Sequence, residues 1–241
     1  MLGGVHVTVI VPAFEEAPRI GRVIRGMPPG VDRIVVVDDA SRDATSAAAR
    51  EAGDARVVVL RHARNLGVGA AIVTGYRSAL AQPGAPRDAF VVMAGDGQMD
   101  PGDLPALVLP IARGEAGYVK GNRFLDPDVR RSMPAARRLG GVVLSWLTAR
   151  AIAQPIDDAQ CGYTAISRAA CAELDLAGLW PRYGYPNDLL GQLAVRRIPI
   201  AEVRVRPIYA DEISGLRPRH VVTIGALIAR AYVRRTRALG R

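Results

Sequence analysis

Short apolar runs alternate with longer amphipathic stretches through the first half of the chain. The apolar runs are rich in β-branched residues and lie at His6–Val11, Arg33–Val37, Arg56–Leu60 and Ala89–Met93. Such runs are typical of strands that are buried on both faces of a parallel sheet. The stretches between them have helical periodicity and span Arg19–Met27, Ala44–Ala52, Gly69–Leu80 and Leu104–Arg113. This alternation predicts βαβ units in an open, doubly wound α/β sheet.

The second half of the chain is less regular but continues the same scheme. We expect further strands at Glu115–Asn122, Gly162–Ser167 and Ala201–Ile208, and helices at Ala135–Ala153 and Asp188–Val195. No internal repeat and no linker divides the sequence into two parts. We therefore expect a single domain.

A last, amphipathic helix is expected from His220 onward. Its apolar face consists of Val221, Ile224, Leu227, Ile228 and Ala231. The opposite stripe consists of four arginines: Arg230, Arg234, Arg237 and Arg241. A basic stripe opposite an apolar face is typical of a helix that lies on an anionic membrane surface. The alternative is a helix that packs on the domain and exposes its arginines to solvent.

Composition narrows the class of protein. The chain has 241 residues, 49% of them hydrophobic and 23% charged, which excludes a mainly disordered protein. The two cysteines, Cys161 and Cys171, are too few for a disulfide scaffold and lack the spacing of a zinc site. The longest apolar stretch, Leu139–Ala149, is shorter than the ~20 residues that a membrane-spanning helix needs. We expect a soluble or peripheral protein of the cytoplasm, without a signal peptide.

The net charge of +9 is concentrated near the C-terminus, where seven arginines and no acidic residue follow Glu212. Nucleic acid is disfavoured as a partner because this segment contains one tyrosine and no set of stacking aromatic residues.

Acidic residues follow three of the predicted strands. Glu15 and Glu16 come after the first strand, Asp38 and Asp39 after the second, and Asp96 after the fourth. Because ligands bind at the carboxyl ends of the strands in open α/β sheets, these positions predict a binding site at that edge. Helix capping is the alternative for a single acid, but it does not account for two adjacent carboxylates.

Asp96 and Gln98 are candidates for a metal site. A carboxylate beside an amide oxygen suits Mg²⁺ or Mn²⁺ bridging a diphosphate, and a plain turn is the alternative. The segment Gly67-Val68-Gly69 is the only candidate for a phosphate loop. It lacks both the G-x-G-x-x-G spacing and a Walker lysine. We therefore interpret it as a helix start at which small residues allow close packing.

Four segments in this order, VIVPAFEE, VVVDDASRDAT, RNLGVGAA and VVMAGDGQMDP, resemble the nucleotide-binding half of family 2 glycosyltransferases with the GT-A fold. Downstream, GNRF at 121–124 and DAQCGY at 158–163 resemble elements of polyprenyl-phosphate sugar transferases, the dolichol-phosphate mannose synthase group. The similarity covers roughly residues 5 to 215. It implies a mixed, mostly parallel sheet flanked by helices, in a domain spanning 1–215. Within that domain the nucleotide-binding half is about 1–122 and the acceptor half about 123–215, and the amphipathic helix occupies 216–241.

The resemblance also implies roles for individual residues. The nucleotide-binding residues would be Pro12, Ala13, Phe14, Glu16, Asp39 and Asp96. Asp96 and Gln98 would hold the metal ion, and Arg123 matches a basic residue near the phosphates. The metal at Asp96, aided by Arg123 or Lys120, would neutralise the leaving diphosphate. Asp188 matches the acid proposed as catalytic base, with a helix N-cap as the alternative.

Three positions depart from the family pattern. Ala94 replaces the first aspartate of the D-x-D metal motif, so one carboxylate is lost. Thr164 and Gly215 stand where the polyprenyl-phosphate group prefers arginine and lysine.

We therefore expect a metal-dependent glycosyltransferase that uses a UDP- or GDP-sugar donor, with Mg²⁺ or Mn²⁺ as cofactor. Its acceptor is a polyprenyl phosphate, at the cytoplasmic face of the membrane, or another acceptor. A nucleotidyltransferase is one alternative, although the acidic VPAFEE replaces the basic glycine-rich loop that such an enzyme needs. A catalytically degenerate, nucleotide-binding partner subunit is the other, because of Ala94.

Overall fold

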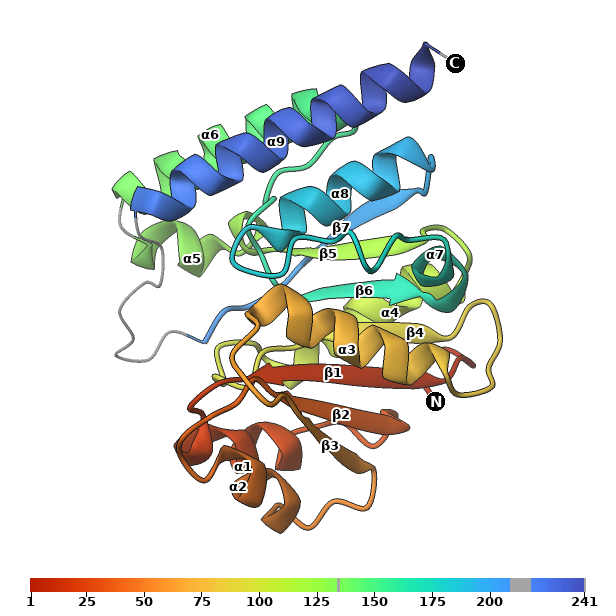
Figure 1. The fold of residues 1–241 in the computed structure, drawn as a ribbon, viewed down its shortest axis with the longest axis vertical. Helices are drawn as coiled ribbons and strands as arrows, with labels where there is room; N and C mark the ends of the chain where they lie inside the picture. Colours follow the sequence, from red (N-terminus) through yellow and green to blue (C-terminus); the bar gives the residue numbers. More distant parts are fainter. Residues whose placement is uncertain (134, 209–217, 241) are drawn as a thin grey trace.

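The computed structural model describes residues 1–133, 135–208 and 218–240, which form one seven-stranded sheet with helices on both faces (Figure 1). The strands are β1 (Val7–Ala13), β2 (Arg33–Asp38), β3 (Val57–Arg61), β4 (Ala89–Val92), β5 (Tyr118–Asn122), β6 (Thr164–Ser167) and β7 (Ile200–Arg204). Their spatial order is β3-β2-β1-β4-β6-β5-β7. Only β6 runs antiparallel, against both β4 and β5. The predicted mixed, mostly parallel sheet is confirmed.

The principal helices also occur where the sequence predicts them, with ends shifted by a few residues. They are α1 (Ala17–Arg25), α2 (Thr45–Glu51), α3 (Val68–Leu80), α4 (Leu104–Ala112), α6 (Ala135–Ile152), α8 (Tyr185–Val195) and α9 (Pro218–Leu239). Four short elements were not predicted from the sequence: η1 (Pro101–Asp103), η2 (Arg123–Leu125), α5 (Pro127–Ser132) and α7 (Arg168–Ala172). These are too short to produce a recognisable period.

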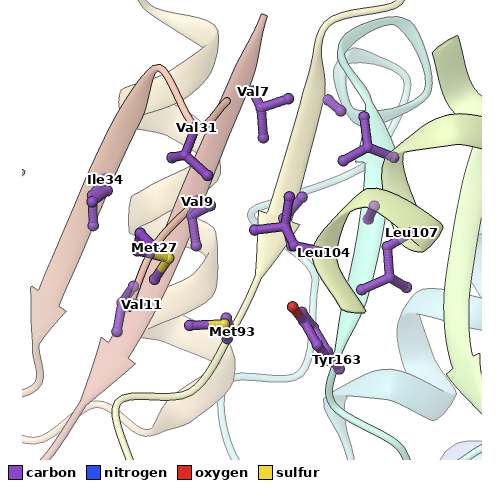
Figure 2. Close-up of a cluster of buried hydrophobic side chains, with 14 of the residues drawn as sticks. Val7, Val9, Val11, Met27, Val31, Ile34, Met93, Leu104, Leu107 and Tyr163 are labelled. Atoms are coloured by element: carbon purple, nitrogen blue, oxygen red, sulfur yellow. The ribbon is translucent and has the colours of Figure 1, made fainter. Parts of the chain in front are cut away.

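The apolar strands are buried on both faces because successive residues point into two different cores. Val7, Val9 and Val11 of β1 face the core that is shared with α1 and α4, as Figure 2 shows. Ile10, between them, faces the second core, which α3 and α8 cover. This arrangement explains why the predicted strands are continuously hydrophobic rather than alternating.

The order of the strands creates the place for a ligand site. The chain runs from β1 outward to β2 and β3, and then returns to pair β4 with the other side of β1. The connections after β1 and β4 therefore leave the sheet in opposite directions. A crevice opens at the carboxyl ends of strands where the order reverses in this way.

Most of the predicted apolar face of α9 packs on the domain, although its first residue, Val221, is exposed. Ile224, Leu227, Ile228 and Ala231 are buried against the rest of the chain. A Cβ on Gly191 of α8 would lie 2.7 Å from the Cβ of Ala231, so the two helices approach closely only because this residue is glycine. Figure 1 shows α6 beside α9. The expected boundary at 215/216, with Gly215, and the stripe residue Arg241 lie outside the described residues.

No helix in the described part of the chain combines the length and apolar character needed to cross a membrane.

Candidate active site

A cavity of about 290 Å³ lies at the carboxyl ends of β1, β2 and β4. All six residues predicted to bind the nucleotide line it: Pro12, Ala13, Phe14, Glu16, Asp39 and Asp96. Asn65, Gly67 and Ala94 contribute to its wall as well. The structure thus brings the candidate residues of three strands together in one place, which we call the strand-end cavity. Their binding role stays a prediction.

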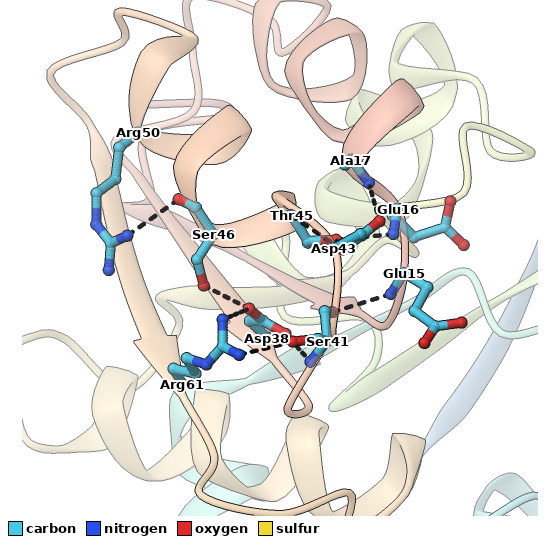
Figure 3. Close-up of polar contacts among 10 residues, drawn as sticks. All are labelled: Glu15, Glu16, Ala17, Asp38, Ser41, Asp43, Thr45, Ser46, Arg50 and Arg61. Carbon is cyan, nitrogen blue, oxygen red and sulfur yellow. Dashed lines mark hydrogen bonds and ion pairs between the residues drawn. The ribbon is translucent and has the colours of Figure 1, made fainter.

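The turn after β1 is held by side chains of the loop after β2 (Figure 3). The hydroxyl oxygen of Ser41 accepts a hydrogen bond from the amide of Glu15 at 2.9 Å, and that of Thr45 accepts one from Glu16 at 2.9 Å. Glu15 and Ala40 have φ angles of 58° and 64°, in the left-handed region that non-glycine residues seldom adopt. The turns at Glu15 and Ala40 are therefore held beside the strand-end cavity in conformations that cost some free energy.

Asp38 belongs to this framework rather than to the cavity. Its buried carboxylate accepts hydrogen bonds from the Ser41 amide at 2.8 Å, from the Ser46 hydroxyl, and from Arg61 at 3.0 Å. Burial acts to raise the pKa of Asp38, but the hydrogen bonds from Ser41 and Ser46 and the charge of Arg61 bring it below its ordinary value. Asp38 is thus an ionised anchor for the loop.

Asp39 lines the strand-end cavity and also holds the segment at Leu66 and Gly67, which forms part of the cavity wall. One carboxylate oxygen accepts the amide of Leu66 at 2.8 Å and lies 2.7 Å from Nδ1 of His62, while the other accepts the amide of Gly67 at 2.7 Å. Nε2 of His62 lies 2.9 Å from the Thr74 hydroxyl. Asp39 therefore has a structural function in addition to the predicted contact with base or ribose.

His62, which follows β3 directly, was not predicted as a site residue from the sequence. Its position just after a predicted strand, like that of Asp39 after the neighbouring strand β2, is the signal that would have indicated it. Gly67, next to these contacts, has φ +100°, and a Cβ there would lie 2.7 Å from the carbonyl oxygen of Pro181. Only glycine fits this close approach.

The two candidate metal ligands do not share a cavity. Asp96 lines the strand-end cavity, and its Oδ1 accepts the amide of Gln98 at 3.0 Å. Gln98 lines a smaller cavity of about 50 Å³ together with Arg123. Within the described ranges, no group of three or more His, Cys, Asp or Glu side chains forms a ready metal site. One carboxylate suits Mg²⁺ or Mn²⁺ only if phosphate oxygens of a bound ligand complete the coordination, as they do in many phosphate-binding enzymes.

An ion pair joins the two downstream motifs, GNRF at 121–124 and DAQCGY at 158–163. Nε and Nη2 of Arg123 donate to the buried carboxylate of Asp158 at 2.7 and 2.9 Å. Burial acts to raise the pKa of Asp158, but Arg123 lowers it. Lys120 is fully buried nearby, donates to the carbonyl oxygen of Cys161, and has its pKa lowered by burial. The Arg123 guanidinium is thus held in a fixed orientation beside Gln98.

An apolar cavity of about 290 Å³ lies between the strand-end cavity and the cavity of Arg123. It shares Ala94 with the strand-end cavity, and Met99 and Gly162 with the cavity of Arg123. Its remaining wall includes Tyr183 and Gly184 from the segment before α8. The three cavities therefore adjoin one another, and together we call them the active-site cleft.

Asp188 does not line any of these three cavities. Its buried carboxylate accepts hydrogen bonds from Arg234 at 2.6 Å and from the amide of Trp180 at 2.9 Å, and Arg230 lies 3.5 Å away. The N-cap alternative is wrong, because α8 begins at Tyr185 and places Asp188 in its first turn. The role of catalytic base stays a prediction. Thr164 is buried within β6.

The chain matches the family described as glycosyl transferase family 2 over residues 8–175. An uncharacterized glycosyltransferase of Mycobacterium tuberculosis is 34% identical over 206 residues, covering 85% of this chain and 86% of the relative. A UDP-N-acetylglucosamine–dolichyl-phosphate N-acetylglucosaminyltransferase of Methanococcus voltae is 28% identical, covering 84% and 86%. An undecaprenyl-phosphate mannosyltransferase of Micrococcus luteus is 28% identical, covering 83% and 82%.

Among solved structures, glucosyl-3-phosphoglycerate synthase of Mycobacterium tuberculosis has a TM-score of 0.70 at 25% identity, covering 95% of this chain and 81% of its own. Complexes of that synthase contain UDP with Mn²⁺ or with Mg²⁺. The fold and the cleft define a glycosyltransferase of the GT-A type. The chain belongs to glycosyl transferase family 2, and the resemblance to its polyprenyl-phosphate sugar transferases is confirmed.

Proposed function

We propose that this glycosyltransferase transfers a sugar from a UDP- or GDP-sugar to a polyprenyl phosphate, with Mg²⁺ or Mn²⁺ bound. One observation carries the proposal: the active-site cleft leads from the strand-end cavity to Arg123, and an apolar groove begins at the next residue, Phe124. The strand-end cavity would thus take the nucleotide, the apolar cavity the sugar, the cavity of Arg123 the acceptor phosphate, and the groove the lipid chain.

The donor occupies the strand-end cavity and the adjoining apolar cavity. Pro12, Phe14 and Asp39 surround the nucleoside, and Asp96 faces the diphosphate. A divalent ion held by Asp96 and the phosphates would neutralise the leaving diphosphate. The UDP complexes of the M. tuberculosis synthase, with Mn²⁺ or Mg²⁺, support this placement.

The acceptor phosphate lies beside Arg123, and its isoprenoid chain runs along α6. The groove beside α6 has a volume of about 840 Å³ and a mainly apolar wall that includes Phe124, Leu125, Trp146 and Ile156. The relatives that act on dolichyl and undecaprenyl phosphate support this acceptor.

The acceptor chemistry removes the need for a general base. A phosphate monoester is ionised near neutral pH, so its oxygen can attack the anomeric carbon directly. The bond from that carbon to the β-phosphate oxygen breaks, and the nucleoside diphosphate leaves with the electron pair. Arg123, oriented by Asp158, holds the acceptor phosphate for this attack.

We place the membrane contact on α6 rather than on the arginine stripe of α9. The outer face of α6 exposes large apolar side chains: Leu139, Val142, Val143, Trp146 and Leu147. The guanidinium of Arg150 lies 5.0 Å from the centre of the Trp146 ring, a pairing suited to the boundary between lipid and water. Arg230 and Arg234 of the stripe point instead toward the buried Asp188. Peripheral binding at the cytoplasmic face would bring a lipid acceptor to the groove.

A transfer assay tests the proposal. The purified chain is incubated with labelled UDP- and GDP-sugars and a short polyprenyl phosphate in detergent, with Mn²⁺ or with EDTA. We expect label in the organic phase only with metal. A catalytically degenerate partner subunit, which Ala94 suggests, would bind the nucleotide but produce neither lipid-linked sugar nor free sugar.

A further inference from the structure

The carboxylate of Asp188 joins three parts of the chain. It lies on α8, it accepts the hydrogen bond of Arg234 from α9, and its second oxygen accepts the amide of Trp180. Its side chain is 1% exposed. A buried carboxylate of this kind stabilises the fold only while its partners are present, because an unpaired charge in the interior is strongly destabilising.

Trp180 belongs to the 178–184 loop, and α9 contacts this loop at more than one point. The indole of Trp180 donates to the carbonyl oxygen of Tyr183 at 3.1 Å, which closes the loop on itself. The ring of Tyr183 stacks on His220 of α9, with 4.6 Å between ring centres. Gly184 adopts φ +99°, and a Cβ there would lie 3.0 Å from Leu227. The C-terminal helix therefore supports one side of this loop.

The far side of the same loop contacts the donor side of the active-site cleft. The carbonyl oxygen of Pro181 accepts the amide of Ala70 in the first turn of α3 at 2.9 Å. A Cβ on Gly69 would lie 2.3 Å from the carbonyl oxygen of Trp180, so the loop backbone touches α3 directly. Tyr183 and Gly184 form one wall of the apolar cavity between Ala94 and Gly162.

We propose that Asp188 is a positioning residue: paired with Arg234, it fixes the 178–184 loop as the wall of the cavity that receives the donor sugar. The C-terminal helix is then an integral part of the transferase, and two of its arginines, Arg230 and Arg234, act inward. The inference rests on the proposed position of the sugar in the apolar cavity. It assigns Asp188 no proton transfer, in agreement with an acceptor that is already ionised.

Binding measurements on single variants test this role. UDP, UDP-N-acetylglucosamine, GDP and GDP-mannose are titrated with Mn²⁺ into the unmutated protein, Asp188→Asn, Arg234→Gln and the double variant. We expect each single variant to reduce the preference for the sugar-bearing nucleotide over the bare one by about tenfold, with little change for the bare nucleotide. The double variant should be no worse than the single ones, because both changes break the same contact. Arg234→Lys, which keeps the charge, should retain most of the preference.

Arg237→Gln is the matched control, because Arg237 is exposed on α9 one turn beyond Arg234. A second readout follows the loop itself. In a Trp146→Phe background, Trp180 is the only tryptophan, and acrylamide should quench its fluorescence more in Asp188→Asn and Arg234→Gln than in Arg237→Gln.

Two results would overturn the inference. Loss of transfer in Asp188→Asn, with Arg234→Gln unchanged in both sugar preference and quenching, would assign Asp188 to the chemistry instead. Equal quenching and equal preference in all variants would leave Asp188 without a positioning role. If the unmutated protein binds none of the four nucleotides, the proposed function itself fails, and that failure is visible before any variant is compared.

Discussion

Asp38 and Asp39 are adjacent in the sequence, yet their surroundings give them different functions. Asp38 is enclosed by hydroxyl groups and Arg61 and holds a loop, whereas Asp39 lines the strand-end cavity and holds the segment before α3. The sequence predicts that both carboxylates reach one sheet edge. The sequence does not predict that the two carboxylates have different functions. That difference depends on partners such as Arg61, which the register of β2 against β3 places beside Asp38.

The pKa of Asp38 predicts a pH dependence of stability. Its folded-state pKa lies below the ordinary value of 3.8, so the ionised carboxylate stabilises the fold above that pH. This contribution is lost as the pH falls from the ordinary value through the folded-state pKa. Urea unfolding between pH 6 and pH 3 should therefore show a smaller loss of stability in Asp38→Asn than in the unmutated protein. The same loss in both proteins would contradict this assignment.

His62 supports the strand-end cavity through Asp39. His62→Ala removes a hydrogen-bond partner from both Asp39 and Thr74, and we expect the free energy of unfolding to fall by about 1–3 kcal/mol. UDP or GDP affinity should fall with it, because the segment around Gly67 loses part of its support. His6→Ala is the control, since His6 is exposed. Equal effects of the two substitutions on nucleotide binding would show that His62 does not support the cavity.

At the scale of helices and strands, hydrophobic periodicity predicts where the elements lie but not what covers each face. The apolar residues of α9 and α6 both have a helical period in the sequence. In the structure the α9 face is buried from Ile224 to Ala231, while α6 exposes Trp146 and its neighbours. The difference arises from packing between α8 and α9, at positions such as Gly191 and Ala231, that are distant in sequence. The short elements α5 and α7 could not be predicted for lack of a period.

The exposed face of α6 predicts membrane binding. Replacing Trp146 and Leu147 together by glutamine should reduce co-sedimentation with anionic vesicles, because it removes apolar area that would enter the lipid boundary. Val222→Gln on α9 is the control, since Val222 is 76% exposed but does not line the groove. If the control reduces binding as much as the α6 change, or if no binding occurs at low salt, the contact does not lie on α6.

For the whole molecule, the order of motifs along the chain was sufficient to predict the fold and the family. The active-site cleft was not predictable, because its residues are distant in sequence. Ala94 and Tyr183 line one cavity and Arg123 lines the next, in a sheet where β6 lies between β4 and β5. We propose that residues 1–122 bind the nucleotide, and that residues 123–215 bind the acceptor and also border the donor sugar through Tyr183 and Gly184. The packing of α9 on α8 joins the C-terminal segment to the second of these parts.

The proposed function requires that the strand-end cavity bind a nucleoside diphosphate together with a divalent ion held by Asp96. Calorimetric titration of UDP and GDP with Mn²⁺, and again with EDTA, measures this binding in the unmutated protein and in Asp96→Asn. We expect one of the two nucleotides to bind at least about tenfold more tightly with metal, and Asp96→Asn to remove most of that gain while the fold remains intact. Equal affinity with metal and with EDTA in the unmutated protein would contradict the account.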